Sequence, residues 1–132
     1  MIKAVIDTNV LVSAFWTKNR LSPTVRIANA IAQDKFTPVY STGMISEYRE
    51  VLSRTKFDFS VAEVNALIDH IVTHGELSGP AEVDVEFQDP DDKVFYCTAI
   101  ASESNLVTGN TKHYPHADFV VTPAQFCELL GI

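Results

Sequence analysis

Short apolar runs alternate with amphipathic segments along almost the whole chain, and this alternation limits the fold more than any other feature. Strand-like runs are expected at residues 2–7, 36–40, 106–108 and 118–121. Strands separated by helical segments are typical of β-α-β units, in which the strands lie parallel and the helices cover the faces of the sheet. The sequence therefore predicts an α/β fold, a three-layer α/β/α sandwich with a mainly parallel central sheet.

The helices are predicted from their starting signals and apolar stripes. A polar cap followed by proline at the first helical position occurs at Ser22-Pro23, Asp89-Pro90 and Thr122-Pro123. Ser60-Val61-Ala62-Glu63 reads as a capping box in front of a strong apolar stripe. Helices are therefore expected at about 9–16, from Ser22-Pro23 to near Asp34, from Ser41 or Thr42 through Leu52, behind Ser60, from Asp89-Pro90 to about Ser104, and from Thr122-Pro123 through Leu130.

The weakest pattern lies between the fourth and fifth of these helices. Gly75 and Gly79-Pro80 break the chain, and residues 82–87 alternate weakly, as in an edge strand. Residues 110–116 are expected to form a loop or a single helical turn. The 132 residues contain no repeat and no linker, so they are expected to form one domain, 1–132.

Composition limits the functional classes to which the chain can belong. The formal net charge of −7 argues against a protein that holds nucleic acid by bulk electrostatics, although bound dications would weaken that objection. Cys97 and Cys127 lack metal-ligand spacing and are expected to be buried thiols, which argues against a zinc site at the cysteines. The chain has no apolar span of about 18 residues and starts directly with a strand, so a cytoplasmic protein without membrane contact is expected.

Four polar residues are placed where a parallel sheet gathers functional groups. Asp7 ends the first strand, Glu47 lies in the first turns of the helix after the second strand, Asp92 lies in the first turn of the helix that starts at Asp89-Pro90, and Asn110 follows the strand 106–108. Ligands of open α/β sheets bind outside the carboxyl ends of the strands. The four side chains are therefore expected to meet at one edge of the sheet.

Carboxylates gathered at one edge need compensation. Two of them about 4 Å apart repel by about 4 kcal/mol at an effective dielectric constant of 20. Hard oxygen ligands favour Mg²⁺ or Mn²⁺, and such ions polarise a phosphodiester and activate water. Asp7, Glu47 and Asp92 are thus predicted metal ligands, direct or through water. The alternative for Asp92 alone is an ordinary acid at a helix start.

The order of these motifs resembles that of PIN-domain ribonucleases, the toxins of bacterial toxin–antitoxin pairs. The resemblance covers essentially the whole chain. The matching segments are Asp7-Thr8-Asn9, Ile45–Leu52, Asp89-Pro90-Asp91-Asp92 with its helix, Thr108-Gly109-Asn110, and Thr122–Phe126. The resemblance implies a Mg²⁺- or Mn²⁺-dependent endoribonuclease with Asp7, Glu47 and Asp92 as catalytic residues. It also implies an RNA substrate, a small antitoxin partner and a homodimer.

The chain departs from the family at Asn110, where much of the family carries an acid. An amide oxygen orients a water or a neighbouring carboxylate but adds no charge, so one firmly held ion is expected and Asn110 is an auxiliary ligand. A weak or inactive domain that binds RNA or protein therefore stays open as an alternative. Asp91 and Asp118 are candidates to replace the missing charge.

Small hydrogen-bonding residues beside the acids also have two readings. Thr8, Asn9 and Thr108 either orient the carboxylates or serve as turn and cap residues.

The residue types at the ends of the predicted strands exclude two other classes of protein that handle phosphate groups. A receiver domain needs two acids after the first strand and a Lys after the fifth, and a haloacid-dehalogenase-type phosphatase needs Asp-x-Asp, whereas Asp7 is followed by Thr8-Asn9.

Several other residues are assigned less specific roles. His113 and His116 are left outside the site, as loop histidines that face solvent. Trp16 and Phe15 are expected in the core or an interface. Basic residues expected near the same edge are candidates for contacts with the RNA backbone: Lys18, Arg20, Lys93 and Lys112.

Overall fold

A five-stranded parallel sheet forms the centre of the protein, as the alternation of strands and helices predicts. The structure, a computed structural model, describes residues 1–79, 81, 86–87 and 89–132. The strand order is β3-β2-β1-β4-β5, and every pair is parallel. The strands are β1 (Lys3–Ile6), β2 (Thr37–Tyr40), β3 (Glu76–Leu77), β4 (Asn105–Val107) and β5 (Val120–Val121).

Helices connect the strands and begin where the cap and proline signals predict. In the described ranges they are α1 (Thr8–Trp16), α2 (Pro23–Ala32), α3 (Thr42–Leu52), α4 (Val61–His74), α5 (Pro90–Ser102) and α6 (Pro123–Leu130), with a 3-10 turn, η1, at Thr111–His113. Asp89 caps α5 by accepting a hydrogen bond from the amide of Asp91. Within these described helices, none is long and apolar enough to cross a membrane.

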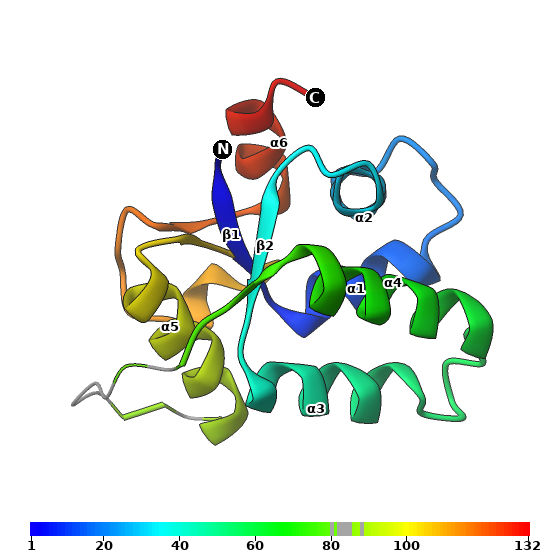
Figure 1. The fold of residues 1–132 in the computed structure, drawn as a ribbon, viewed down its shortest axis with the longest axis horizontal. Helices are drawn as coiled ribbons and strands as arrows, with labels where there is room; N and C mark the ends of the chain where they lie inside the picture. The colour runs from blue at the N-terminus through cyan, green and yellow to red at the C-terminus, as the bar shows by residue number, and fades with distance from the viewer. Residues whose placement is uncertain (80, 82–85, 88) are drawn as a thin grey trace.

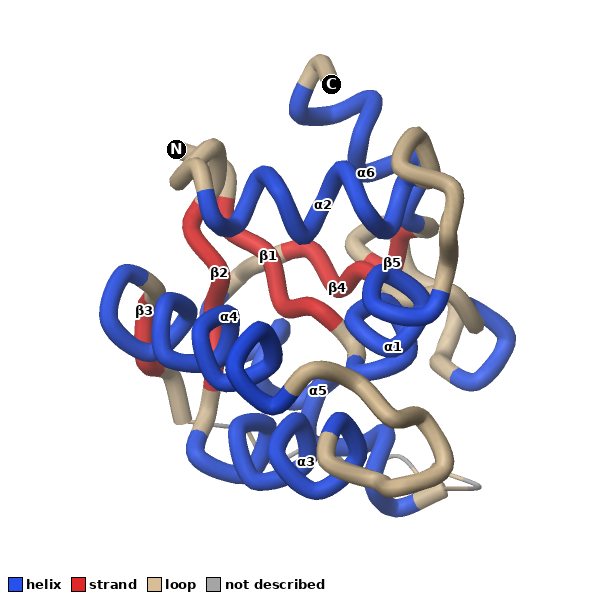
Figure 2. Tube along the Cα trace, turned by 90° about the vertical axis from the view of Figure 1, so that its right-hand side faces the viewer, coloured by secondary structure: helices blue, strands red, loops and turns tan. Residues whose placement is uncertain are grey.

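The helices cover both faces of the sheet, which gives the three layers. Helix α5 packs against β1, β2 and β4, and in Figure 1 it lies to the left of β1 and β2, with α1, α2 and α4 to the right. Helix α2 packs on both α4 and α6, and α4 also contacts β2. Figure 2, turned by 90°, shows the strands enclosed between these helices and α5.

The central strand β1 positions the first acid. Its residues Ala4, Val5 and Ile6 are buried, because strands lie on both sides and helices cover both faces. Ile6 is in register with Val107 of β4. The chains that leave β1 and β4 therefore emerge side by side at the carboxyl edge of the sheet.

The edge strand differs from the expected one. The strand expected at residues 82–87 falls mostly on residues outside the described ones, and the described Glu86 and Phe87 are not in a strand. Instead, β3 follows Gly75 directly and pairs with Val39 and Tyr40 of β2. The final strand is also shorter than the expected 118–121.

Candidate active site at the carboxyl edge

Asp7 is the buried centre of the candidate site. It follows β1 directly and caps α1, with only 5 % of its surface exposed. The hydroxyl groups of Thr108 and Tyr114 both donate to its Oδ2 over 2.9 Å, and the amide of Asn9 approaches the same oxygen at 3.4 Å. Oδ1 receives none of these three side-chain donors. Burial raises the pKa of Asp7, while these hydrogen bonds act in the opposite direction.

Asn9, Thr108 and Gly109 tie the end of β1 to the end of β4. The side-chain amide of Asn9 donates to the Thr108 hydroxyl over 3.3 Å, and its side-chain oxygen Oδ1 accepts from the backbone N–H of Gly109 over 3.0 Å. The backbone N–H of Asn110 donates to the same Thr108 hydroxyl over 3.0 Å. These bonds hold Asp7 and the loop after β4 in fixed relation, and the orienting role of Asn9 and Thr108 stays a prediction.

Thr8 is placed differently from its two neighbours. Its side chain is buried, and its Oγ1 has no hydrogen-bond partner among the described residues. Its backbone amide does lower the pKa of Asp7. The role predicted for the Thr8 hydroxyl therefore stays a prediction.

Glu47 approaches Asp7 from α3. Burial raises its pKa to about 7, and the nearby charges of Asp91, Asp7, Asp89 and Glu50 add to the shift in that order. Asp91 is thus the neighbour that acts most on Glu47. This places Asp91, a candidate to replace the charge missing at Asn110, on the Glu47 side of the site.

Asp92 approaches Asp7 from the first turn of α5. Burial raises its pKa to about 6, the charges of Asp7 and Asp89 add to the shift, and His113 opposes it. His113 Nδ1 lies 3.5 Å from Asp92 Oδ2, and the side-chain nitrogen Nδ2 of Asn110 lies 2.9 Å from His113 Nε2. The imidazole ring of His113 therefore lies between the Asn110 side chain and the Asp92 carboxylate and contacts both.

The structure adds two aromatic residues and one histidine to the site. Tyr114 is buried and donates to Asp7, and Tyr48 is buried and donates to the carbonyl oxygen of Ile6, the residue before Asp7. His113, left outside the site on sequence grounds, contacts both Asn110 and Asp92. A large aromatic side chain in a polar loop, as at Tyr114, is the one sequence signal that could have suggested burial against the site.

Other acids near the site have partners elsewhere. Arg54, which lies two residues beyond the end of α3, binds both carboxylate oxygens of Glu50, at 2.8 and 3.2 Å. Asp89 accepts the Asp91 amide as the N-cap of α5. Among the described residues, Asp7, Glu47 and Asp92, with Asp91 near Glu47, are thus the candidate cation ligands at this edge, and the oxygens of Asp7, Glu47 and Asp92 do not all lie within 4.8 Å of one another.

A cleft of about 410 Å³ lies beside Asp92. Its lining combines acidic, basic and aromatic side chains: Glu86, Phe87, Asp89, Asp92, Lys112, His113, Tyr114 and Pro115. Lys112 is therefore the predicted basic contact that lies at the site. Arg20 instead lines a separate groove with Glu63 and His70.

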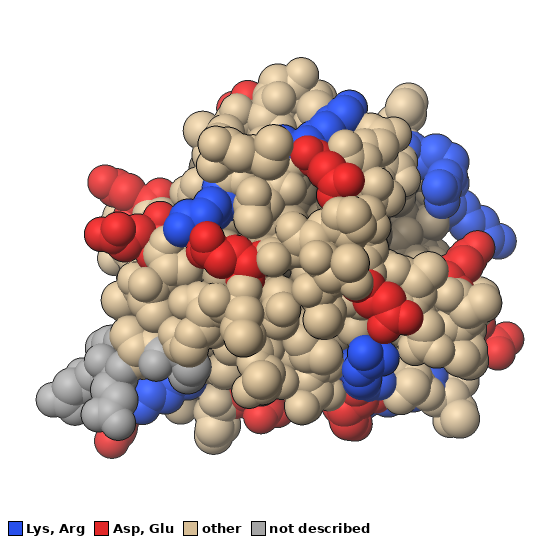
Figure 3. All heavy atoms as spheres, in the orientation of Figure 1, with Lys and Arg blue, Asp and Glu red and all other residues tan. Residues whose placement is uncertain are grey.

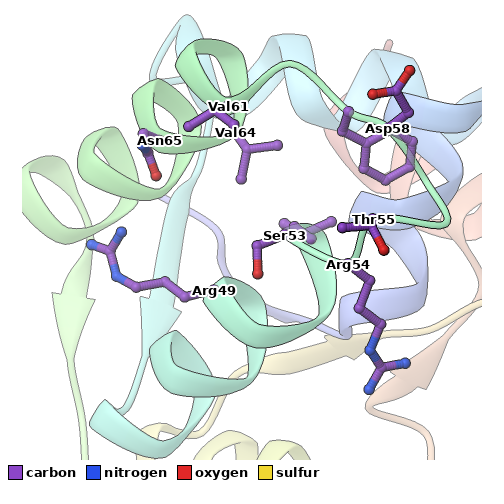
Figure 4. Close-up of a pocket in the computed structure, with 10 residues that line it drawn as sticks. Arg49, Ser53, Arg54, Thr55, Asp58, Val61, Val64 and Asn65 are labelled. Atoms are coloured by element: carbon purple, nitrogen blue, oxygen red, sulfur yellow. The ribbon is translucent and has the colours of Figure 1, made fainter.

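A second cleft of similar volume lies between the end of α3 and the start of α4 (Figure 4). Two of its residues, Arg49 and Arg54, direct their guanidinium groups outward, and each pairs with a surface acid, Asp69 and Glu50. None of the four sequence-predicted site residues is in its described lining. This cleft is not the candidate site.

The molecular surface agrees with the negative net charge. On the face shown in Figure 3, the coloured acidic and basic residues are interspersed and do not form a continuous basic surface. The described residues on this face therefore form no broad basic patch that could attract a phosphate backbone.

A parallel α/β sandwich with buried and half-buried carboxylates at the carboxyl edge of its sheet defines the class of protein. The family model described as "PIN domain" matches residues 3–112. The chain belongs to the PIN domain family. No curated protein matches it.

A solved structure shares the fold. This is the crystal structure of VapBC2 from Rickettsia felis bound to a DNA fragment from their promoter. The similarity covers 92 % of this chain and 97 % of that chain, with a TM-score of 0.54 and 16 % sequence identity. At this identity the match supports the architecture, and the role of the site rests on its own geometry.

Proposed function

We propose that the protein is a metal-dependent endoribonuclease that acts as the toxin of a toxin–antitoxin pair. The observation that carries the proposal is the position of Asp7, whose charge raises the pKa of both Glu47 and Asp92. Burial is the largest cause of both shifts, and the Asp7 charge adds to each of them. Glu47 of α3 and Asp92 of α5 thus both lie near Asp7, at the edge of the sheet where α/β proteins bind ligands. Membership of the PIN domain family, as the sequence resemblance implies, supports a nuclease.

The donor set fits a hard dication. Asp7, Glu47 and Asp92 supply carboxylate oxygens, the ligand type that Mg²⁺ and Mn²⁺ favour. All three have raised pKa values, and a bound cation would favour their charged forms. When bound, such an ion supplies Lewis-acid polarisation of a phosphodiester and activation of a water.

The protein's own residues have distinct tasks in this proposal. Thr108 and Tyr114 fix the Asp7 carboxylate through Oδ2, whereas Oδ1 receives neither hydroxyl group. The pKa values of Glu47 and Asp92 are about 7 and about 6 without a cation, and a bound cation would keep both carboxylates ionised, so that they could accept hydrogen bonds from the attacking water and orient it. Lys112 and His113 line the adjoining cleft, where they can contact the phosphate backbone of the RNA.

An exposed apolar surface supports a protein partner. Trp16 is 62 % exposed and packs edge-on against Phe57 and Phe59. Beside α1, a groove of about 510 Å³ runs between α2 and α4 and is lined in part by Phe15, Val25 and Leu67. Apolar surface of this kind is typical of protein interfaces, and the antitoxin is the partner that we assign to it.

The deciding experiment measures RNA cleavage with Mg²⁺ or Mn²⁺, with and without a chelator. Asp7→Asn, Glu47→Gln and Asp92→Asn should each reduce cleavage by at least about two orders of magnitude, because each removes a ligand charge without changing side-chain shape. Asp69→Asn is the matched control, since Asp69 is an exposed acid of α4 paired with Arg49. Equal cleavage by all variants would disprove the site. Metal binding without cleavage would instead favour the binding-module alternative.

A further inference from the structure

A separate group of metal-binding side chains lies at the opposite edge of the sheet. Asp34 stands just before β2, and His74 ends α4 just before β3, so both lie at the amino ends of strands. Asp7 and Asn110 follow the carboxyl ends of β1 and β4. In a parallel sheet these are opposite edges, which separates the group from the candidate active site.

Three ligand atoms converge in this group. His70 Nε2 lies 2.9 Å from Asp34 Oδ1, and His74 Nδ1 lies 3.9 Å from the same oxygen. All three atoms lie within 4.8 Å of one another. Ligands of a tetrahedral zinc ion, each about 2.0–2.1 Å from the metal, are roughly 3.3 Å apart. Rotations about the side-chain torsions would therefore bring the three atoms to bonding distance of one ion.

The backbone directs all three side chains to one place. His70 and His74 are four positions apart on α4, so they project from the same face one turn apart. Asp34 has a φ of +55°, in the left-handed region, and its amide donates to the carbonyl oxygen of Ile31 at the end of α2. The turn that follows α2 thus presents its carboxylate to the last turns of α4.

The two imidazole rings lie close together but must turn before they can share one ion. The imidazole rings of His70 and His74 stack with centroids 4.2 Å apart at an angle of 15°. Two cationic rings at that distance would repel each other, and one carboxylate oxygen cannot neutralise both. The neutral imidazole is the form that binds metal. Both nitrogens lie near the one carboxylate oxygen, and rotation of the rings out of the stack would direct both of them to one ion beside it.

We propose that Asp34, His70 and His74 bind one Zn²⁺ or a similar borderline dication, which ties the end of α2 to the end of α4. Imidazole and carboxylate ligands suit zinc, cobalt and nickel, whereas Mg²⁺ prefers oxygen alone. Side-chain exposures of 54 % for Asp34 and 50 % for His74 leave the remaining coordination position open to water. The site is independent of the proposed nuclease function.

The experiment titrates the metal-free full chain with Zn²⁺ and Co²⁺ in excess Mg²⁺, which occupies the carboxylate site. We expect one equivalent of Zn²⁺ to bind, to raise the Tm, and to shift the imidazole NMR signals of His70 and His74. With Co²⁺ we expect visible absorption bands of imidazole coordination. His74→Ala and Asp34→Asn should weaken Zn²⁺ binding at least tenfold.

The variants are chosen so that folding does not obscure the result. Asn at position 34 tolerates the left-handed backbone, and residue 74 is half-exposed at the end of its helix. His116→Ala, an exposed loop histidine, is the control and should bind Zn²⁺ as the parent does. The proposal is overturned if the His70→Ala/His74→Ala double variant binds Zn²⁺ with unchanged affinity. It is also overturned if the parent binds only at millimolar metal.

Discussion

Burial and hydrogen bonding act in opposite directions on the Asp7 carboxylate. Burial raises its pKa, and the hydroxyl groups of Thr108 and Tyr114 lower it by donating to Oδ2. Hydrogen bonds to a charged group contribute more than those between neutral groups. The two hydroxyl groups therefore help to keep Asp7 ionised and available to a cation.

Removing the Tyr114 hydroxyl tests this account. Tyr114→Phe should lower the free energy of unfolding by about 1–3 kcal/mol at a pH where Asp7 is ionised, and by less in acid, where the acceptor is neutral. Urea denaturation at several pH values measures the difference. Tyr40→Phe is the control, because its half-buried hydroxyl donates to the neutral Val72 carbonyl oxygen over 3.2 Å. Equal losses in the two variants at every pH would show that the Tyr114 bond is not charge-assisted.

Asn110 is neutral at a position where an acid would add a negative charge for cation binding. Asn110→Asp should tighten Mn²⁺ binding several-fold, equivalent to about 1 kcal/mol, because it adds a negative charge beside His113 and Asp92. Electron paramagnetic resonance of Mn²⁺ titrations measures the affinity. Asn65→Asp makes the same charge change on exposed α4 and should have little effect. Unchanged binding in Asn110→Asp would mean that this side chain does not face the metal.

The sequence predicts the position of Asp7 but not that of Tyr114, for a physical reason. Asp7 follows a buried apolar run, so the strand period places it at the sheet edge. Tyr114 lies in the loop after η1, where no hydrophobic period specifies direction. Its contact with Asp7, 107 positions away, depends on how the chain between β4 and β5 folds back.

The edge strand β3 depends on a close approach between two backbones. A Cβ at Gly75 would lie 2.4 Å from the carbonyl oxygens of both Ile71 and Pro38. Pro38 is tolerated inside β2 because the neighbouring Thr37 amide bonds to β1, and pairing with β3 begins only at Val39. A two-residue strand shows too little alternation of apolar and polar residues to be predicted, so the sequence predicts the edge strand at residues 82–87 instead of at β3.

Substitution of Gly75 tests the importance of this approach. Gly75→Ala should destabilise the protein by about 1–3 kcal/mol, because the added methyl group overlaps backbone atoms that cannot move independently. Thermal and urea denaturation measure the loss. Gly79→Ala is the control, since no described atom lies within 4 Å of its Cβ position, and it should change stability by less than about 1 kcal/mol. A stable Gly75→Ala protein would mean that α4 and β2 separate easily at this point.

At the scale of the whole molecule, the acids at the carboxyl edge make the free energy of unfolding depend on pH and on metal. The pKa of Glu47 is raised from 4.5 to about 7 and that of Asp92 from 3.8 to about 6. Between the unfolded and folded values the unfolded chain binds fewer protons than the folded one, so stability falls as pH rises through this range. A dication reverses the effect, because it binds the ionised carboxylates of the folded state.

The metal-free protein should therefore lose stability between about pH 4 and pH 7, and saturating Mn²⁺ should remove most of that loss. Because Glu47 is only partly buried, screening by solvent reduces its share to about 1 kcal/mol, which Glu47→Gln should eliminate. Urea denaturation with a chelator or Mn²⁺ across this pH range measures both effects. Asp69→Asn should keep the full slope, since Asp69 lies on the exposed face of α4. A metal-free stability that rises with pH over the same interval would mean that Glu47 and Asp92 are not held partly buried beside Asp7, and the cation site would lose its physical basis.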